Sequence, residues 1–227
     1  MKNKILVVAA HPDDEILGAG GTILKHVKGG DEVNILILGD GELSKGEGAD
    51  VVRREKQCQK VAEKLGAKKV YLEKFPDNAF DSISLLKITK KVELIINQIK
   101  PDTIYTHHAY DLNVDHRLTF QAVLTACRPQ PDFFVKKILT FEILSSTEWQ
   151  AKDRNNMFCP NEYNNIEDFI DKKIEALLIY KDELREYPHP RSVEGVKTLA
   201  RYRGMEVGLN FAEVFQIIRL IKDGKNL

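Results

Sequence analysis

The chain has 227 residues, and its 34 Lys and Arg side chains balance its 34 Asp and Glu side chains, so the formal net charge is zero. This length suits one well-cored domain, and no shift in composition divides residues 1–227 into two. A neutral chain lacks the basic field that attracts nucleic acids, so we expect no nucleic acid polymer as a partner. No apolar run approaches the ~20 residues of a membrane span, and the N-terminal apolar stretch is too short for a signal peptide. We therefore expect a cytoplasmic protein without a transmembrane segment.

Strand-like and helix-like segments alternate along the first two thirds of the chain. Strands are predicted at residues 4–10, 33–38, 69–72, 103–106 and 138–143. Helices are predicted between them at residues 15–28, 50–65, 85–100 and 117–127. This alternation predicts an α/β fold, a single Rossmann-like domain with a mostly parallel sheet flanked by helices.

The last third of the chain is less regular. Apolar residues recur at helical spacing over residues 165–185 and predict one amphipathic helix packed on the sheet. A further helix is predicted at residues 193–207 and a late strand at residues 211–218. Two segments are predicted to be loops: residues 39–48, which hold four glycines, and residues 149–165, which are rich in Asn. Long loops near strand ends are good walls for a substrate site.

The three cysteines, Cys58, Cys127 and Cys159, are odd in number, and no two of them have CxxC spacing. This argues against a disulfide framework and against a thiolate zinc site. We expect ordinary thiols in a reducing compartment.

Two polar clusters each follow a predicted strand. The first is the segment HPDDE at residues 11–15, and the second is HHAYDLNVDHR at residues 107–117. Ligands bind at the carboxyl ends of strands in α/β sheets. His11, Asp14 and His116 would make a His-Asp-His set of three ligands that leaves a position for water, as in hydrolytic zinc sites. We therefore predict a metal site that joins the two clusters.

Such a site suits amide hydrolysis. Zinc lowers the pKa of bound water from ~15.7 toward ~7, and a nearby carboxylate then takes the proton as the water attacks a carbonyl. Side chains that are adjacent in an extended turn point in different directions, so Asp13 and Asp14 divide into a base and a ligand. The residues alone leave open which is which. Zn²⁺ matches the ligands best, and other divalent first-row metals are also compatible with them.

The motif AHPDDEILGAGGTI at residues 10–23, followed by DLNVDHR at residues 111–117, resembles the PIG-L/LmbE-like family of zinc-dependent de-N-acetylases. Supporting segments are RRE at 53–55, PDNAFDS at 76–82, RSVEG at 191–195 and AEVF at 212–215. The resemblance implies a zinc-dependent enzyme that removes the N-acetyl group from an N-acetylated amino sugar or sugar conjugate. It also implies a small-molecule substrate, and it is compatible with a homo-oligomer.

Carried over to this sequence, the resemblance makes His11, Asp14 and His116 the zinc ligands and Asp13 the general base. Asn113 stands where many members of the family carry a histidine, three residues before the downstream ligand. Asn113 is suited to donating a hydrogen bond to a developing oxyanion, but it cannot act as an acid at neutral pH.

Protonation of the leaving amine would therefore fall to Asp13, to His107 or to His108. The two histidines alternate across a strand, so at most one of them is expected to face the site. We keep His108 as a catalytic candidate.

Five further side chains are candidates for supporting roles. Glu15 is expected in the first turn of a helix, where the helix dipole favours a carboxylate. Glu15 and Asp115 are also placed to orient the metal ligands from behind. Arg53, Arg54 and Arg191 are candidates for binding a sugar hydroxyl, a phosphate or a carboxylate, and their alternative is a solvated helix face or an internal ion pair.

Two other functions stay open. The segment Gly18-Ala19-Gly20-Gly21 suggests a dinucleotide-binding protein, but these glycines do not directly follow the strand. Three acidic residues also stand where a pyrophosphate needs bare N–H groups. The replacement of the family histidine by Asn113 allows a non-catalytic sugar- or metal-binding protein on the same scaffold.

Overall fold

The computed structural model of the protein describes residues 2–222, in which seven strands form one sheet in the order β3-β2-β1-β4-β5-β7-β6. Five neighbouring strands are parallel: β1 (Lys4–Ala9), β2 (Glu32–Gly39), β3 (Lys69–Phe75), β4 (Thr103–His107) and β5 (Lys137–Phe141). At one edge β7 (Ala212–Leu220) runs antiparallel to β5, and β6 (Glu162–Asn165) runs antiparallel to β7.

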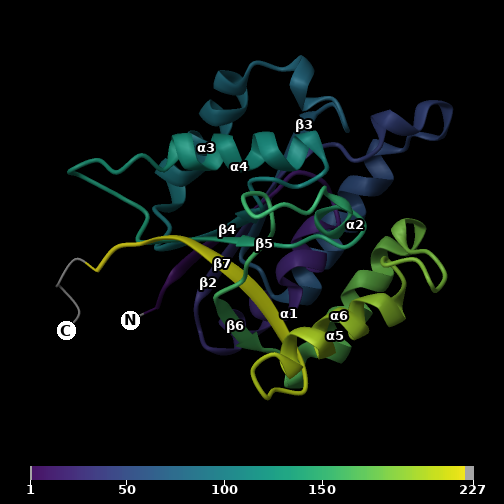
Figure 1. The fold of residues 1–227 in the computed structure, drawn as a ribbon. Coiled ribbons are helices and arrows are strands. Elements are labelled where there is room, and N and C mark those ends of the chain that lie inside the picture. Colours follow the sequence, from purple (N-terminus) through teal and green to yellow (C-terminus); the bar gives the residue numbers. More distant parts are fainter. Residues whose placement is uncertain (1, 223–227) are drawn as a thin grey trace.

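Helices cover both faces of the sheet (Figure 1). One face carries α3 (Leu85–Ile99) and α4 (Val114–Ala126). The other carries α1 (Asp14–Lys28), α2 (Val51–Leu65), α5 (Ile170–Leu177) and α6 (Val193–Met205). Short 3-10 helices complete the chain: η1 (Leu43–Gly48), η2 (Phe80–Ser82), η3 (Thr147–Trp149), η4 (Glu167–Phe169) and η5 (Leu178–Glu183). The predicted α/β fold with a mostly parallel sheet is confirmed. Within residues 2–222, the helices are too short or too polar to cross a membrane.

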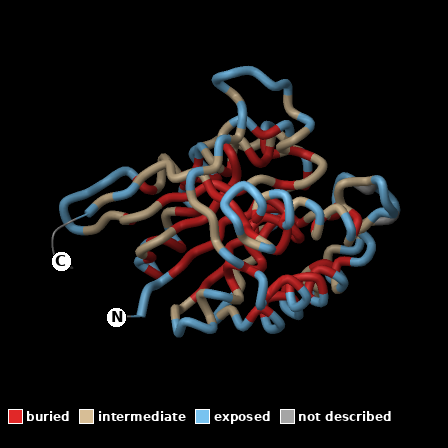
Figure 2. Tube along the Cα trace, turned by 60° about the horizontal axis from the view of Figure 1, so that its bottom comes forward, coloured by how far each residue is buried: buried red, intermediate tan, exposed pale blue. Residues whose placement is uncertain are grey.

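Each layer of helices covers its own apolar core. Every residue from Ile5 to Ala10 is buried, and alternate side chains of β1 join the two cores. This explains why the first strand is a continuous apolar run rather than an alternating one, since both of its faces are covered. Figure 2 shows the buried residues running through the centre of the molecule, with exposed residues on the outer loops and outer helix faces.

The order of the strands positions the functional site. β1 lies between β2 and β4, so the chain leaves it toward one side of the sheet and returns on the other. The carboxyl ends of β1 and β4 therefore flank the crevice where doubly wound sheets bind ligands. The HPDDE segment follows β1, and the second polar cluster begins at the end of β4. Two clusters about 100 residues apart in the sequence thus meet at one place, as predicted.

The glycines of α1 allow close packing. A Cβ atom on Gly18 would lie 2.5 Å from the Phe141 ring, and one on Gly21 would lie 2.8 Å from Ile166. Both glycines are inside the helix rather than at the strand-to-helix turn where a dinucleotide motif requires them. The packing accounts for these glycines without a bound dinucleotide.

Two local predictions were wrong, and one helix begins earlier than predicted. The segment predicted as one helix at residues 165–185 is divided into η4, α5 and η5, and the backbone leaves the helical region at Tyr180, whose side chain is fully buried. β6 forms within the predicted loop at residues 149–165, because its polar residues pair with β7 through the main chain. α4 begins at Val114 rather than at residue 117, because the Asn113 side chain caps it by accepting a hydrogen bond from the Asp115 N–H.

The cysteines are all free, with Cys58 and Cys127 buried and Cys159 exposed. Burial raises the pKa of each buried thiol to about 12. Both buried thiols therefore stay protonated at neutral pH, which agrees with the prediction of ordinary thiols.

Candidate metal centre

The turn after β1 points two adjacent carboxylates in different directions. Asp13, the residue before α1, has a φ of 107°, in a region that residues other than glycine rarely adopt. The Asp14 side chain turns back, and its Oδ2 accepts a hydrogen bond from the His11 N–H at 2.8 Å. Asp13 Oδ2 instead lies 3.2 Å from the Arg191 guanidinium. Unusual backbone conformations of this kind persist where the surrounding structure holds them, often at functional sites.

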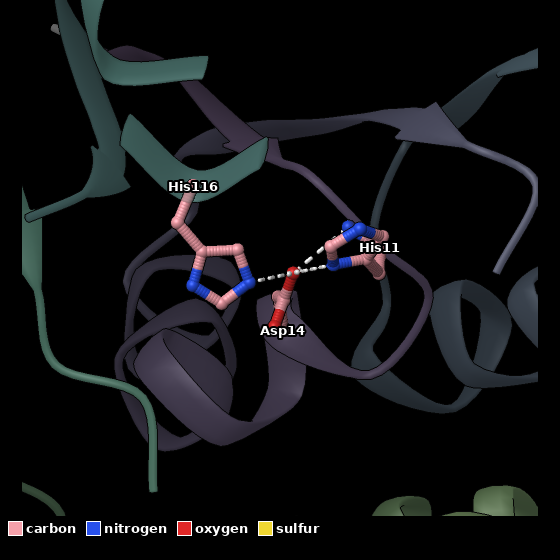
Figure 3. Close-up of side chains that lie close together, drawn as sticks. All are labelled: His11, Asp14 and His116. Atoms are coloured by element: carbon pink, nitrogen blue, oxygen red, sulfur yellow. Dashed lines mark hydrogen bonds and ion pairs between the residues drawn. The ribbon is translucent and has the colours of Figure 1, made fainter. Parts of the chain in front are cut away.

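His11, Asp14 and His116 converge on one point (Figure 3). Asp14 Oδ2 lies 3.4 Å from His11 Nδ1 and 3.3 Å from His116 Nε2. Four ligands placed tetrahedrally at ~2.0–2.1 Å from a zinc ion lie roughly 3.3–3.4 Å from one another. The distances from Asp14 to the two rings therefore match a shared cation.

The same three residues contain buried polar atoms without hydrogen-bond partners. Asp14 Oδ1 and His116 Nε2 are both buried, and neither makes a hydrogen bond in the part of the chain that the structure describes, although His116 Nε2 lies 3.3 Å from Asp14 Oδ2. Buried polar atoms of this kind destabilise the folded protein unless another group, such as a bound ion or water, interacts with them. A divalent cation between the two rings would satisfy His116 Nε2, and a His-Asp-His donor set suits zinc.

Each of the two histidines is also oriented by a carboxylate behind it. His11 Nε2 lies 2.9 Å from Asp115 Oδ2, and His116 Nδ1 lies 3.1 Å from Asp111 Oδ1. Proteins commonly fix the ligating nitrogen of a histidine in this way. Asp115 was predicted from the sequence and Asp111 was not, although Asp111 lies in the same motif, five residues before His116.

Asp111 is itself tightly held. It accepts hydrogen bonds from the hydroxyls of Ser146 and Thr147, which follow β5. Burial alone would raise the pKa of Asp111, but these bonds and the His116 ring hold it well below its usual range. Asp111 therefore stays ionised beside His116 and links the second polar cluster to the loop after β5.

Asp77 is a second carboxylate of the site that was not predicted from the sequence. Its Oδ1 lies 3.3 Å from His11 Nε2, and with His11 and Asp115 it forms another group close enough to hold a metal. The same ring nitrogen is already at hydrogen-bond distance from Asp115. We therefore regard the group formed by His11, Asp14 and His116 as the better cation site. Asp77 belongs to the PDNAFDS segment, and this motif was the sequence signal that could have identified it as a site residue.

Glu15 stabilises the turn after β1 by accepting two hydrogen bonds. The Tyr180 hydroxyl donates a hydrogen bond to Glu15 Oε1 at 2.9 Å, and the Asp13 N–H donates to Oε2 at 3.0 Å. Burial raises the pKa of Glu15 to about 8, and the neighbouring Asp13 adds to the rise. Burial also raises the pKa of Asp13 to about 7, although the Arg191 guanidinium opposes that rise.

His107 and His108 point in different directions, as their alternation predicted. The His107 ring stacks on His116 with 4.0 Å between ring centroids, and its Nε2 accepts a hydrogen bond from the Ala10 N–H at 2.8 Å. His108 Nε2 lies 3.0 Å from the Asn156 carbonyl oxygen. The structure therefore brings His107 behind the candidate metal ligands and does not bring His108 to them.

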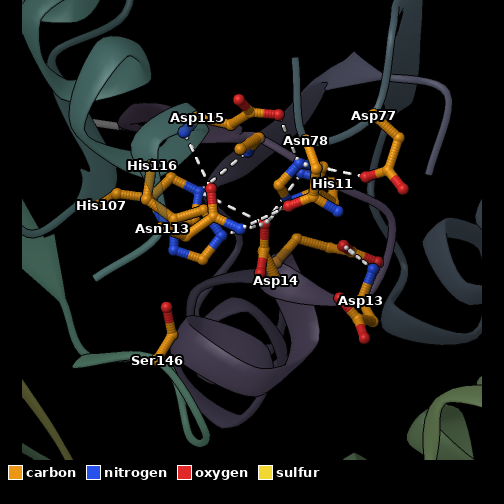
Figure 4. Close-up of polar contacts among 12 residues, drawn as sticks. His11, Asp13, Asp14, Asp77, Asn78, His107, Asn113, Asp115, His116 and Ser146 are labelled. Atoms are coloured by element: carbon orange, nitrogen blue, oxygen red, sulfur yellow. Dashed lines mark hydrogen bonds and ion pairs between the residues drawn. The ribbon is translucent and has the colours of Figure 1, made fainter. Parts of the chain in front are cut away.

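A cavity of about 140 Å³ opens beside His11 and Asp13. Its remaining lining residues are Pro12, Gly41, Ser44, Asp77, Asn78, Asn113, Glu183 and Arg191. Figure 4 shows Asn113 next to the candidate metal ligands. Asn113 Nδ2 donates to Asn78 Oδ1 at 2.9 Å, and an amide nitrogen carries two hydrogens. The second N–H of Asn113 is therefore a potential donor to a ligand.

The three predicted arginines have different surroundings. Arg191 lines the cavity and pairs with Asp13. Arg54 is only 1% exposed and pairs with Glu42 and with Glu183. Arg53 lies at the surface, 2.5 Å from Asp182. The structure thus brings Arg191 to the cavity and leaves Arg53 and Arg54 outside it.

Fold and site together define a class: an α/β protein with a potential His-Asp-His metal group at the carboxyl edge of a doubly wound sheet. The family model described as PIG-L, GlcNAc-PI de-N-acetylase, matches residues 6–127. The chain belongs to this family. The matched residues include both polar clusters and the whole candidate metal group.

Two curated relatives agree with this assignment, and a solved structure shares the fold. The chain is 26% identical over 192 residues to the probable N-acetyl-alpha-D-glucosaminyl L-malate deacetylase 2 of Bacillus cereus, covering 81% of this chain and 84% of the relative. It is 26% identical over 227 residues to the diacetylchitobiose deacetylase of Thermococcus kodakarensis, covering 95% and 83%. The solved N,N'-diacetylchitobiose deacetylase from Pyrococcus horikoshii shares the fold, with a TM-score of 0.77, 22% identity, and coverage of 95% of this chain and 84% of that one.

Proposed function

We propose that this protein is a metal-dependent hydrolase that removes the N-acetyl group from an N-acetylated amino sugar or sugar conjugate. The observation that carries the proposal is the convergence of His11, Asp14 and His116 beside Asp13, which lines a cavity. The names of the relatives support the same class of substrate, since both are deacetylases of N-acetylated sugars.

His11, Asp14 and His116 would hold the cation, and we propose zinc because its preferred ligands are of these types. A divalent cation bound there supplies Lewis-acid chemistry, polarising the acyl carbonyl and acidifying water. Asp111 and Asp115 keep the ring nitrogens of the two histidines in the orientation that this binding needs.

Asp13 is the proposed general base. Its carboxylate is buried, lines the cavity and is positioned by the ion pair with Arg191. It takes a proton from the attacking water and then returns that proton to the leaving amine. His108 is the weaker candidate for protonating the leaving amine, because its ring is hydrogen-bonded to the main-chain carbonyl oxygen of Asn156. The second N–H of Asn113 is suited to donating a hydrogen bond to the carbonyl oxygen of the substrate as negative charge develops on that oxygen.

Metal stoichiometry tests the ligand set. Plasma mass spectrometry of the purified protein should find about one metal per chain, following the three-ligand, one-ion pattern. His116→Ala should lose the metal, whereas His108→Ala, a matched change of another buried histidine in the same cluster, should keep it. Equal metal in the unchanged protein and in His116→Ala would refute the ligand assignment.

Acetate release tests the reaction. With N,N'-diacetylchitobiose and N-acetylglucosamine as first substrates, Asp13→Asn should keep its metal and lose activity by about 10²–10⁴-fold. Full activity in that variant would remove Asp13 from the base role. A protein that binds metal and sugar but releases no acetate would favour the non-catalytic alternative, which the replacement of the family histidine by Asn113 suggests.

A further inference from the structure

The cavity beside His11 and Asp13 is small. Its volume is about 140 Å³, less than the ~300–1,000 Å³ of pockets that enclose most of a drug-sized ligand. Its described lining residues are mostly polar or small, and the His11 ring is the only aromatic group among them. The cavity therefore suits the acylated part of one sugar, and a group joined to that sugar must lie on the surface around the cavity.

Trp149, the only tryptophan of the chain, lies beside one wall of this cavity. It is the last residue of η3, and its ring packs edge-on against the His189 ring with 5.7 Å between the centroids. His189 Nδ1 accepts a hydrogen bond at 3.1 Å from the N–H of Arg191, which lines the cavity. Two contacts therefore connect the Trp149 ring to the cavity wall.

The segment that ends at Trp149 is also held against the site. The Leu144 carbonyl oxygen lies 3.4 Å from Arg191 Nε, and the Thr147 hydroxyl donates a hydrogen bond to Asp111. Asp111 is the carboxylate behind one of the candidate metal ligands. The position of Trp149 is thus fixed relative to both the cavity wall and the candidate metal centre.

The Trp149 ring is unusually exposed for an indole. It is 53% exposed, although tryptophan has a large apolar surface whose burial is favourable. Tyr110 and Leu112, which are 46% and 47% exposed, lie just before the cavity residue Asn113. The surface around the cavity therefore offers apolar side chains that the described lining of the cavity lacks.

Resting on the proposed function, we infer that Trp149 is a specificity-determining residue whose indole stacks against a ring joined by a glycosidic bond to the sugar that loses its acetyl group. A second pyranose presents a face of C–H groups, and an aromatic aglycone presents its π-face, so both offer the flat apolar surface that an indole packs against. The enzyme therefore prefers N-acetylated sugars that carry a second ring to single sugars.

Three substrates test this preference through acetate release: methyl N-acetylglucosaminide, phenyl N-acetylglucosaminide and N,N'-diacetylchitobiose. The amide is cleaved and the glycosidic bond is not, so the second group acts through binding. We expect kcat/KM to be at least about fivefold higher for a substrate with a second ring than for the methyl glycoside, as for one additional aromatic contact. A preference for the phenyl glycoside alone would assign an aromatic aglycone, and a preference for the disaccharide alone would assign a second sugar.

Variants connect the preference to Trp149. Trp149→Ala should lower kcat/KM for the preferred substrate at least about fivefold more than for the methyl glycoside, mainly through KM. Trp149→Phe keeps a flat ring and should retain most of the preference. Tyr202→Ala is the matched control, since Tyr202 is 51% exposed on α6 and is not among the described residues that line the cavity. It should leave all three values of kcat/KM unchanged.

Fluorescence provides a second measurement, because the emission of the chain comes from a single tryptophan. In Asp13→Asn, which should bind substrate without cleaving it, N,N'-diacetylchitobiose should shift the emission of Trp149 to shorter wavelength as the ring leaves water. The methyl glycoside should cause no such shift. The same emission for both ligands at saturation would contradict stacking of a second sugar on Trp149.

The outcomes separate this inference from the function on which it rests. Equal kcat/KM for all three substrates in the unchanged enzyme, or a loss in Trp149→Ala that is the same for all three, would overturn the inference alone. No acetate from any of the three, with the metal bound, would overturn the proposed function and the inference with it.

Discussion

Lys173 and Glu213 form a buried ion pair against α1, and we predict that breaking it destabilises the whole domain. Lys173 is 3% exposed and Glu213 is 6% exposed. The Lys173 ammonium donates to Glu213 Oε1 at 2.7 Å and to the Leu17 carbonyl at 2.8 Å. Glu213 also accepts hydrogen bonds from the N–H groups of Gly21 and Thr22, at 2.8 and 2.7 Å. The pair thus fixes the helix whose first turn carries the aspartate of the candidate metal group.

The perturbation is Lys173→Met, which keeps most of the side-chain length and removes the ammonium. A buried carboxylate without its partner costs about 3–5 kcal/mol. Glu213 would keep its two bonds to the main chain, so we expect the lower end of that range, about 3 kcal/mol. For a chain of this size, this corresponds to a fall in Tm of roughly 6–12 °C.

Urea unfolding followed by circular dichroism measures the loss. Lys172→Met is the matched control, because Lys172 is exposed on the same helix, and it should change the free energy of unfolding by no more than about 0.5 kcal/mol. The double variant Lys173→Met/Glu213→Gln should recover part of the loss, since it leaves no unpaired buried charge. If Lys173→Met behaved like Lys172→Met, the reasoning would be refuted.

Three further predictions concern packing, acid stability and thiol reactivity. Gly18→Ala brings a methyl group within 2.5 Å of the Phe141 ring, so urea unfolding should show a loss of about 1–3 kcal/mol, and unchanged stability would contradict the packing. Burial alone would raise the pKa of Asp31, but hydrogen bonds, chiefly with His26, outweigh it and lower that pKa. The stability that Asp31 contributes is thus complete at neutral pH and is lost as acid protonates its carboxyl group in the folded protein. Asp31→Asn should therefore be less stable than the unchanged protein at neutral pH and equally stable in acid. A difference in stability that does not depend on pH would contradict this linkage. Iodoacetamide should label the exposed Cys159 rapidly in the native protein and the two buried thiols only after unfolding, as counted by mass spectrometry, and rapid labelling of all three would contradict their burial.

The sequence by itself determined the architecture, because the signals for it are local. The apolar runs and the helical periods predicted every parallel strand and the four helices α1 to α4 to within a few residues. Two polar clusters at strand ends predicted one site because the carboxyl ends of neighbouring parallel strands meet at one edge of the sheet. Where the pattern was weak, as in the polar strand β6, the prediction failed, since that strand depends on pairing with β7.

Only the tertiary structure decided which side chains meet. It paired Asp115 with His11 and Asp111 with His116, and it separated the two adjacent aspartates of the first turn. Sequence spacing could not show these contacts, because they join segments that come together only when the helices pack on the sheet.

The burial of Arg53 and Arg54 was likewise decided only by the tertiary structure. Arg53 and Arg54 are neighbours on one helix, and both were candidates for substrate binding. One is half-exposed and the other is fully buried between two carboxylates. Successive residues of a helix point about 100° apart, so one can face solvent while the next faces the interior. A sequence records the residue types, whereas the packing of distant segments decides which charge meets a partner and which meets a ligand.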